Sequence, residues 1–282
     1  MMNSTDPTTQ PATPIRVRSL ASGSSGNAYI LESGNDLLLV DCGIGIRQIQ
    51  SALLAWGKSI RDLTGLVISH EHSDHVRALA SFLRQHTQIY ATRGTANALG
   101  LSSDRFSQMR YEEQFEIGCI SVTPIATSHD AAEPCGLLIE TAERTIGLIT
   151  DLGTVTDEIG TYASRCELLI LESNHDREML RMGPYPAYLK RRVAGNFGHL
   201  SNDQAGGFLT EIATATSGPS EIWLAHLSAT NNTPAVAKTA IQDRFRKSGV
   251  SPVVTVLPRS VSGPVWDGAN VRAKQLSLIS DF

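Results

Sequence analysis

The most restrictive feature of the sequence is "ISHEHSDHVRALA" at residues 68–80, where four potential metal ligands follow an apolar run. They are His70, His72, Asp74 and His75. A lone histidine is more often a core or surface residue than a ligand, but the spacing His-x-His-x-Asp-His, where a strand gives way to a helix, indicates a metal site. A chain with this motif has to fold so that one strand end delivers several ligands to one point.

Further donors stand at the ends of other apolar runs. His129 lies in "TSHD", Asp151 in "LITDLG" and His226 in "IWLAHLS". His86, in "LRQHTQ", is predicted to be a solvated residue at a helix end. Imidazoles with a bridging carboxylate suit two divalent ions about 3.5 to 4 Å apart, which generate a hydroxide nucleophile near neutral pH and hold the oxygens of a displacement reaction. The pattern therefore predicts a cleft shared by several strand ends.

Short strand-like runs alternate with helical patterns in both halves of the chain. The runs predicted to be strands are residues 15–20, 27–33, 36–43, 63–69, 119–130, 135–141, 144–153, 166–176, 222–226 and 253–257, the first three of them forming a meander. Helices are predicted at residues 45–57, 76–86, about 202–214 and about 234–247. Mixed strands with interleaved helices indicate an α+β fold in which two sheets pack face to face with helices outside.

The composition is that of an ordinary globular protein, because 282 residues with 41% hydrophobic side chains bury a sizeable core. We expect a disordered tail rich in Ser, Thr, Pro and Gln at residues 1–14 and a single domain at residues 15–282. The sequence shows neither a signal-peptide pattern nor an apolar run of about 18 residues, which predicts a cytoplasmic protein without membrane contact. The cysteines are scattered without a C-x-x-C pair and are expected to be free thiols: Cys42, Cys119, Cys135 and Cys166.

The segment "SHEHSDH", followed in order by His129, Asp151 and His226, resembles the metal site of hydrolases with the metallo-β-lactamase fold, over about residues 15–260. The resemblance implies a four-layer αββα sandwich of two mixed sheets, with the site along one edge. It also implies one ion held by His70, His72 and His129, a second held by Asp74, His75 and His226, and Asp151 bridging them. Imidazole and carboxylate suit zinc and manganese alike, so the expected cofactors are two Zn²⁺ or Mn²⁺ ions.

The residues at two positions distinguish between the reaction types of enzymes with this fold. His72 stands where flavo-di-iron oxidoreductases carry a glutamate, which favours hydrolysis. Asp151 stands where the commonest true β-lactamases carry a cysteine, which goes against antibiotic hydrolysis. The gap from Asp151 to His226 is too short for the extra domain of the β-CASP nucleases, so the core fold itself would grip the substrate.

The segments "LLILESNHD" and "GNFGHLSNDQA" resemble the parts of the tRNA 3′-processing endonuclease that place a glutamate and a histidine beside the phosphate. By this resemblance Glu172 orients His199, and His199 contacts or protonates the phosphodiester. The catalytic residues are then Asp74, Glu172 and His199. Two other interpretations stay open: Glu172 in an ion pair at a strand end, and "GHLSNDQA" as a helix start capped by Ser201 or Asn202.

The strings "SLASGSSGN", "SHEHSDH", "ESNHD", "GPYP", "LKRR", "GHLSN" and "AHLSATNN" resemble the bacterial WalJ (YycJ)-like family of DNA-processing nucleases, which implies 5′ to 3′ exonuclease action on DNA. A net charge of −4 gives no overall attraction to a polyanion, so DNA would need a local basic patch. Residues 175–196 supply one that would contact the phosphate backbone, through His175, Arg177, Arg181, Lys190, Arg191 and Arg192. For each of these basic side chains alone a solvated helix face is the alternative, and for His175 a structural role stays equally open.

Two other functions compete with the nuclease hypothesis. A small-molecule hydrolase acting on a cyclic phosphodiester or a thioester would use the same ligands. A non-catalytic partner in cell-envelope signalling would use the metals only structurally, although a purely structural site needs neither a bridging carboxylate nor an open water position. The native metal, the cleavage polarity and the oligomeric state are not set by the sequence.

Overall fold

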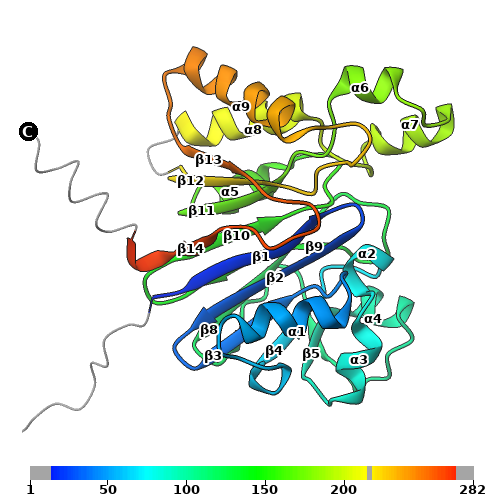
Figure 1. The fold of residues 1–282 in the computed structure, drawn as a ribbon, viewed down its shortest axis with the longest axis vertical. Helices are drawn as coiled ribbons and strands as arrows, with labels where there is room; N and C mark the ends of the chain where they lie inside the picture. The colour runs from blue at the N-terminus through cyan, green and yellow to red at the C-terminus, as the bar shows by residue number, and fades with distance from the viewer. Residues whose placement is uncertain (1–13, 215–217, 271–282) are drawn as a thin grey trace, which may run out of the picture.

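A computed structural model of the chain describes residues 14–214 and 218–270. Within these ranges two seven-stranded mixed sheets pack face to face, and helices cover both outer faces (Figure 1). The predicted αββα sandwich is therefore confirmed. The division into a tail at residues 1–14 and one domain at 15–282 stays a prediction, because residues 1–13 and 271–282 lie outside the described ranges.

The first sheet contains the predicted meander. Its strand order is β14-β1-β2-β3-β4-β5-β6, where β1 is Arg16–Gly23, β2 Gly26–Ser33, β3 Asp36–Val40, β4 Gly65–Val67, β5 Ile89–Thr92, β6 Ser107–Met109 and β14 Val265–Asp267. Strand β2 pairs antiparallel with both β1 and β3, and β3 pairs parallel with β4. The carboxyl ends of β3 and β4 therefore meet at the same edge of the sheet.

The second sheet brings three further strand ends to one edge. Its order is β13-β12-β11-β10-β9-β8-β7, where β7 is Phe115–Ile117, β8 Ile120–Ala126, β9 Cys135–Glu140, β10 Thr145–Ile149, β11 Leu168–Glu172, β12 Glu221–Ala225 and β13 Val253–Val256. Strands β10 to β13 run parallel. Since parallel strands end together, Asp151, Glu172 and His226 emerge side by side.

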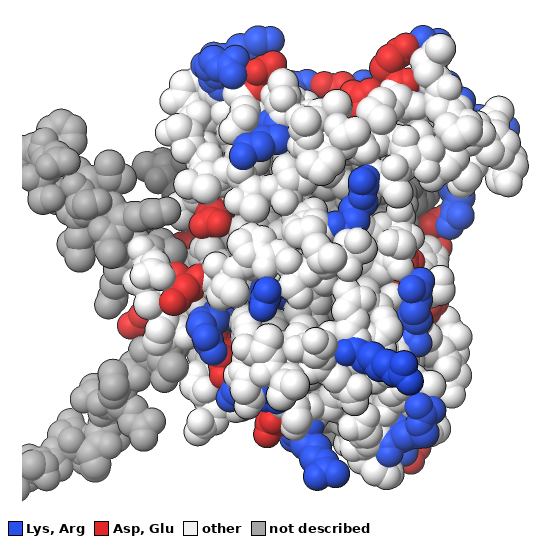
Figure 2. Space-filling model, in the orientation of Figure 1, with Lys and Arg blue, Asp and Glu red and all other residues white. Residues whose placement is uncertain are grey.

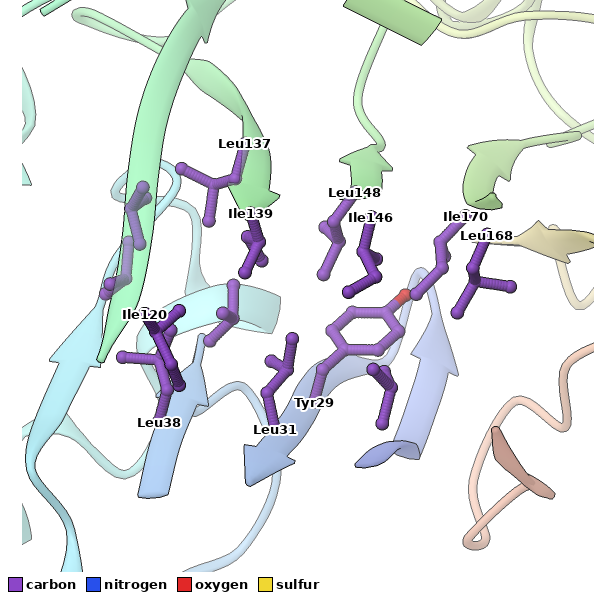
Figure 3. Packing of buried hydrophobic residues seen from close by; sticks show 14 of the residues in the cluster. Tyr29, Leu31, Leu38, Ile120, Leu137, Ile139, Ile146, Leu148, Leu168 and Ile170 are labelled. Atoms are coloured by element: carbon purple, nitrogen blue, oxygen red, sulfur yellow. The ribbon is translucent and has the colours of Figure 1, made fainter. Parts of the chain in front are cut away.

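The main core lies between the two sheets. Alternate residues of each strand point toward the other sheet. Figure 3 shows Tyr29, Leu31 and Leu38 of the first sheet facing residues of the second sheet such as Ile146 and Ile170. Burying each such side chain stabilises the fold by roughly 1.5 to 3 kcal/mol. The core thus fixes the relative position of the two sheet edges.

The helices cover the outer faces over two further apolar clusters. The first sheet is covered by α1 (Ile46–Leu54), α3 (Leu79–Arg84) and α4 (Arg93–Ala98), and the second by α5 (Asp157–Ala163), α8 (Asn202–Thr214) and α9 (Pro234–Ser248). Because both faces of β11 are covered, all five of its residues are buried and its sequence "LLILE" does not alternate. Two short helices, α6 (Arg177–Met182) and α7 (Ala187–Val193), project beside the second sheet (Figure 1).

The helix predicted at residues 76–86 is wrong in one respect. The chain forms α2 (Ser73–Val76) and then α3, with Ala78 between them in a bridge conformation at φ −93° and ψ 1°. The break has a tertiary cause, because the Ala78 N–H donates to the carbonyl of Cys42 at 2.9 Å. The last residues of the His-x-His-x-Asp-His motif therefore lie inside α2, which docks on the end of β3.

Candidate active site

The predicted ligands converge where the carboxyl ends of the strands meet. Five of the seven predicted metal ligands line a cavity of about 210 Å³, and His70 and His75 lie outside its lining. The predicted ligands and catalytic residues in its lining are His72, Asp74, His129, Asp151, His199 and His226. Asp130, Tyr185, Leu189 and Arg192 line it as well. We call this cavity the metal pocket.

His70, His72 and His129 form the first ligand group, with one ring nitrogen of each within 4.8 Å of the others. Nδ1 of His129 donates to the carbonyl of Gly198 at 3.1 Å, and Nδ1 of His70 lies 3.1 Å from the Ser69 hydroxyl. These contacts fix both rings. The Nε2 atom of His70 is buried and has no hydrogen-bond partner among the described residues, as expected for an atom that binds an ion.

Asp74, His75 and His226 form the second group. Nε2 of His226 lies 3.5 Å from Oδ2 of Asp74, and Nε2 of His75 lies 3.6 Å from the same oxygen. Nδ1 of His75 donates to Oδ2 of Asp41 at 2.7 Å, which orients the ring. Sequence reasoning missed Asp41, although it follows the apolar run "DLLLV" as Asp151 follows "GLIT".

Asp151 lies between the two groups. Its Oδ2 is 3.2 Å from Nε2 of His75, and its Oδ1 is 3.6 Å from Nε2 of His129. The Oδ2 atom is buried without a hydrogen-bond partner among the described residues. An unsatisfied buried polar atom costs about 1 to 3 kcal/mol, and this donor set fits divalent cations as the missing partners.

The backbone at three of these strand ends is strained. Asp41, Asp151 and His226 have φ values of 57°, 57° and 54°, in the left-handed region that non-glycine residues seldom adopt. Each follows the end of β3, β10 or β12 within two residues. Strain of this kind costs about 1 to 3 kcal/mol per residue and gathers at functional sites.

The electrostatics of the cluster favour bound cations. Burial lowers the pKa of His226, but Asp151, Asp74 and Glu172 outweigh burial and raise it well above its usual value. Burial raises the pKa of Asp151, but His226 and His75 outweigh burial and hold it well below its usual range. Several buried carboxylates thus stabilise positive charge on whatever occupies the cluster.

Glu172 is fully buried and accepts four hydrogen bonds. Oε1 accepts from Nδ1 of His199 at 2.8 Å and from Nδ1 of His226 at 2.7 Å. Oε2 accepts from the backbone N–H groups of Leu152 at 3.1 Å and Leu200 at 3.0 Å. Glu172 therefore orients a predicted metal ligand as well as His199, a double role that the sequence did not indicate.

The segment carrying His199 is fixed from its other side by a helix cap. The N–H of Gln204 donates to the Ser201 hydroxyl at 3.3 Å, and the N–H of Ser201 donates to Oε1 of Gln204 at 3.0 Å. This reciprocal pair is a capping box at the start of α8. The capping interpretation, with Ser201 as the cap, and the orientation of His199 by Glu172 therefore hold together.

The predicted basic patch is divided by α7. Arg192 lines the metal pocket with Leu189 and Val193, and its Nε donates to Oδ2 of Asp130 at 2.5 Å. Lys190 and Arg191 instead line a second cavity, together with His175, Arg177 and Arg181. On the face shown in Figure 2, basic and acidic side chains are scattered without a continuous patch of one sign.

Other residues singled out in the sequence lie away from the metal pocket. His86 is exposed just beyond α3, as predicted. The cysteines, all within the described ranges, are free. Among the described residues, no helix combines the length and the apolar character that crossing a membrane requires.

Gly43 controls how closely α2 approaches β3, and its replacement gives a first prediction. A Cβ at this position would lie 1.6 Å from the carbonyl oxygen of Asp74 and 2.8 Å from the nitrogen of His75. Gly43→Ala should therefore displace both residues, lower the metal content and reduce turnover roughly 10²-fold or more, as misplacement by about 1 Å can do. Metal analysis and a thermal unfolding curve measure this.

Gly45→Ala is the matched control, since a Cβ there meets nothing within 4 Å and the residue has φ −62°. Full metal content in Gly43→Ala would show that the close approach of α2 does not position Asp74 and His75.

A family model described as "Beta-lactamase superfamily domain" matches residues 37–226. The chain is 33% identical over 236 residues to the exodeoxyribonuclease YycJ of Bacillus anthracis, covering 82% of this chain and 89% of the relative. It is 33% identical over 239 residues to the exodeoxyribonuclease WalJ of Streptococcus pneumoniae serotype 2 (strain D39), covering 81% and 87%. The solved metallo-beta-lactamase fold protein YhfI of Bacillus subtilis matches with a TM-score of 0.69 at 19% identity, covering 91% of this chain and all of that one. Together with a donor set that fits divalent ions, these matches identify the chain as a metal-dependent hydrolase of the beta-lactamase superfamily.

Proposed function

We propose that this chain is a phosphodiesterase that hydrolyses DNA as an exonuclease at a centre of two Zn²⁺ or Mn²⁺ ions. The observation that carries the proposal is that His199, oriented by Glu172, and Arg192 line the same cavity as the metal-ligand cluster. An imidazole and a guanidinium beside the cluster suit a substrate with a negatively charged phosphodiester. The relatives named as exodeoxyribonucleases support DNA as that substrate.

The chain's own residues divide the work at the centre. One ion would be held by His70, His72 and His129, and the other by Asp74, His75 and His226. Asp151 would contact both ions. The ions supply Lewis-acid activation of water and of the phosphoryl group. Asp41, Ser69 and Glu172 hold the imidazole rings in the orientation that binding needs.

His199 is proposed to donate a proton to the leaving oxygen. Its Nδ1 is engaged by Glu172, so the other ring nitrogen is the one free to act. The side chain is 20% exposed and lines the metal pocket, where a substrate can reach it. Glu172 contacts no substrate in this scheme and is a positioning residue.

The size of the metal pocket favours a polymer over a compact small molecule. At about 210 Å³ it is smaller than the roughly 300 to 1,000 Å³ of pockets that enclose small-molecule ligands. A single phosphodiester group fits, while the rest of a nucleic-acid strand stays outside.

The function is tested by offering three substrates to the metal-loaded protein: labelled DNA, bis-p-nitrophenyl phosphate and a glutathione thioester. We expect hydrolysis of the two phosphodiesters, abolished by a chelator and restored by Zn²⁺ or Mn²⁺, and no thioester hydrolysis. Shortening of DNA labelled at either end establishes whether the action is exonucleolytic. Thioester cleavage without phosphodiester cleavage would contradict the proposal and favour a small-molecule hydrolase.

A further inference from the structure

A second cavity, of about 410 Å³, lies against α6, α7 and the start of α8. It is larger than the metal pocket. Four basic side chains line it and no acidic one does, the four being Arg177, Arg181, Lys190 and Arg191. We call this cavity the basic groove.

Two of these cations have no carboxylate partner among the described residues. Arg181 pairs with Glu178, and Arg177 lies 3.8 Å from Asp203. The Lys190 ammonium donates to the carbonyl of Arg181 at 2.7 Å, and no hydrogen bond or ion pair links the guanidinium of Arg191 to another described residue. The groove therefore keeps a net positive charge.

A buried imidazole at the wall is also short of a partner. His175 is 1% exposed and lines the groove, and its Nδ1 is buried without a hydrogen bond to any described residue. Its backbone is fixed, because its carbonyl accepts from the N–H of Asn202 at 2.8 Å. A buried polar atom without a partner calls for one beyond the described side chains, such as a bound water or ion, and here it lies beside several cations.

Helix α7 forms the wall between the two cavities. Its residues Leu189, Arg192 and Val193 line the metal pocket, whereas Lys190 and Arg191 line the basic groove. One ligand can therefore engage both cavities only if it is long enough to pass this helix.

We propose that the basic groove is a phosphate-binding subsite for the same nucleic-acid strand whose scissile phosphodiester lies in the metal pocket. The proposal rests on the proposed function. An α-helix with its side chains is about 10 to 12 Å wide. Phosphates of one strand are spaced about 3.4 Å along a duplex axis and lie farther apart along an extended single strand, so passing α7 takes at most about three phosphate spacings. Strands of about four nucleotides or more would fill both cavities, and a dinucleotide would fill one.

The test compares Lys190→Glu/Arg191→Glu with the wild-type protein on single-stranded oligonucleotides of two to ten nucleotides and on bis-p-nitrophenyl phosphate. For the wild type, KM should fall about tenfold or more as the strand reaches the groove. In the variant KM should not change with length, while kcat and the hydrolysis of bis-p-nitrophenyl phosphate stay normal. The slope of log KM against log salt should shrink by about 1.4, for two phosphate contacts at about 0.7 each on a single strand.

Arg246→Glu/Lys247→Glu is the matched control, because these exposed residues are also an adjacent pair in the last turn of a helix. That helix end lies on the opposite side of the second sheet's helical layer from α7 (Figure 1). The neutral double variant Lys190→Gln/Arg191→Gln should change KM less than charge reversal does. It replaces the charge-reversal variant in the test if that variant does not fold.

The outcomes separate the two proposals. A wild-type KM that does not depend on strand length, or a variant that keeps the wild-type length dependence, would overturn the basic groove while leaving the nuclease function intact. A wild-type protein that hydrolyses no oligonucleotide would overturn the proposed function and the groove's assignment with it.

Discussion

Asp151→Ala should lose at least one of the two bound ions and abolish hydrolysis of DNA and of bis-p-nitrophenyl phosphate alike. Asp151 is the carboxylate that lies between both ligand groups, with Oδ2 at 3.2 Å from His75 and Oδ1 at 3.6 Å from His129. Alanine supplies no donor and leaves several imidazoles without their anionic neighbour. Elemental analysis of protein purified without added metal, paired with activity after reloading, measures the loss.

Asp151→Asn separates charge from backbone geometry in this experiment. Asparagine tolerates the left-handed φ of 57° better than alanine and keeps the shape of the side chain, but it carries no charge. It should fold nearly as well as the wild type and still bind the ions more weakly. Two bound ions with normal turnover in Asp151→Ala would contradict the bridging role.

His199→Ala should retain both ions and near-normal thermal stability and yet lose roughly 10²- to 10⁴-fold in turnover of DNA, the usual range for removing a general acid. The reason is that His199 lines the metal pocket with only one nitrogen engaged by Glu172. The loss should shrink on bis-p-nitrophenyl phosphate, because p-nitrophenolate leaves without protonation. Parallel measurement of kcat on both substrates checks this.

His86→Ala is the matched control for this variant, since it makes the same change at an exposed position. A missing ion in His199→Ala would make His199 a ligand, and an equal loss on both substrates would refute the proton donor. Sequence reasoning predicts that Glu172→Gln shows a weaker form of the His199→Ala defect. The structure changes that expectation: because Glu172 also holds His226, the substitution should lower metal content too.

The sequence predicted the layered fold because its buried strands are long apolar runs ending in polar residues. It did not predict elements such as β5, β6, β7, α4, α5, α6 and α7, which have three to seven residues each. Segments this short show less than two turns of a helix or at most two repeats of a strand, so their periodicity carries little information. Their positions are set by tertiary contacts, as the hydrogen bond from Ala78 to Cys42 illustrates.

The residues of the candidate site that could be predicted are those whose side chains are typical metal ligands or catalytic groups. Spaced histidines and aspartates at strand ends mark potential ligands wherever they occur. Gly43 could not be found in this way, because it matters only through the docking of α2 on it. The division of the basic patch by α7 likewise depends on which helix face each residue occupies.

Helix α7 has no buried residue, although it forms a wall of both cavities. Substitutions at exposed positions usually change the free energy of unfolding by no more than about 0.5 kcal/mol. Glu172, by contrast, cannot be replaced without disturbing two functions. Its Oε1 accepts hydrogen bonds both from His226, a predicted metal ligand, and from His199, the proposed proton donor. With both cavities assigned to the substrate as proposed, α7 carries substrate contacts at positions whose replacement costs the fold little, so homologues that act on different substrates should differ first along this helix.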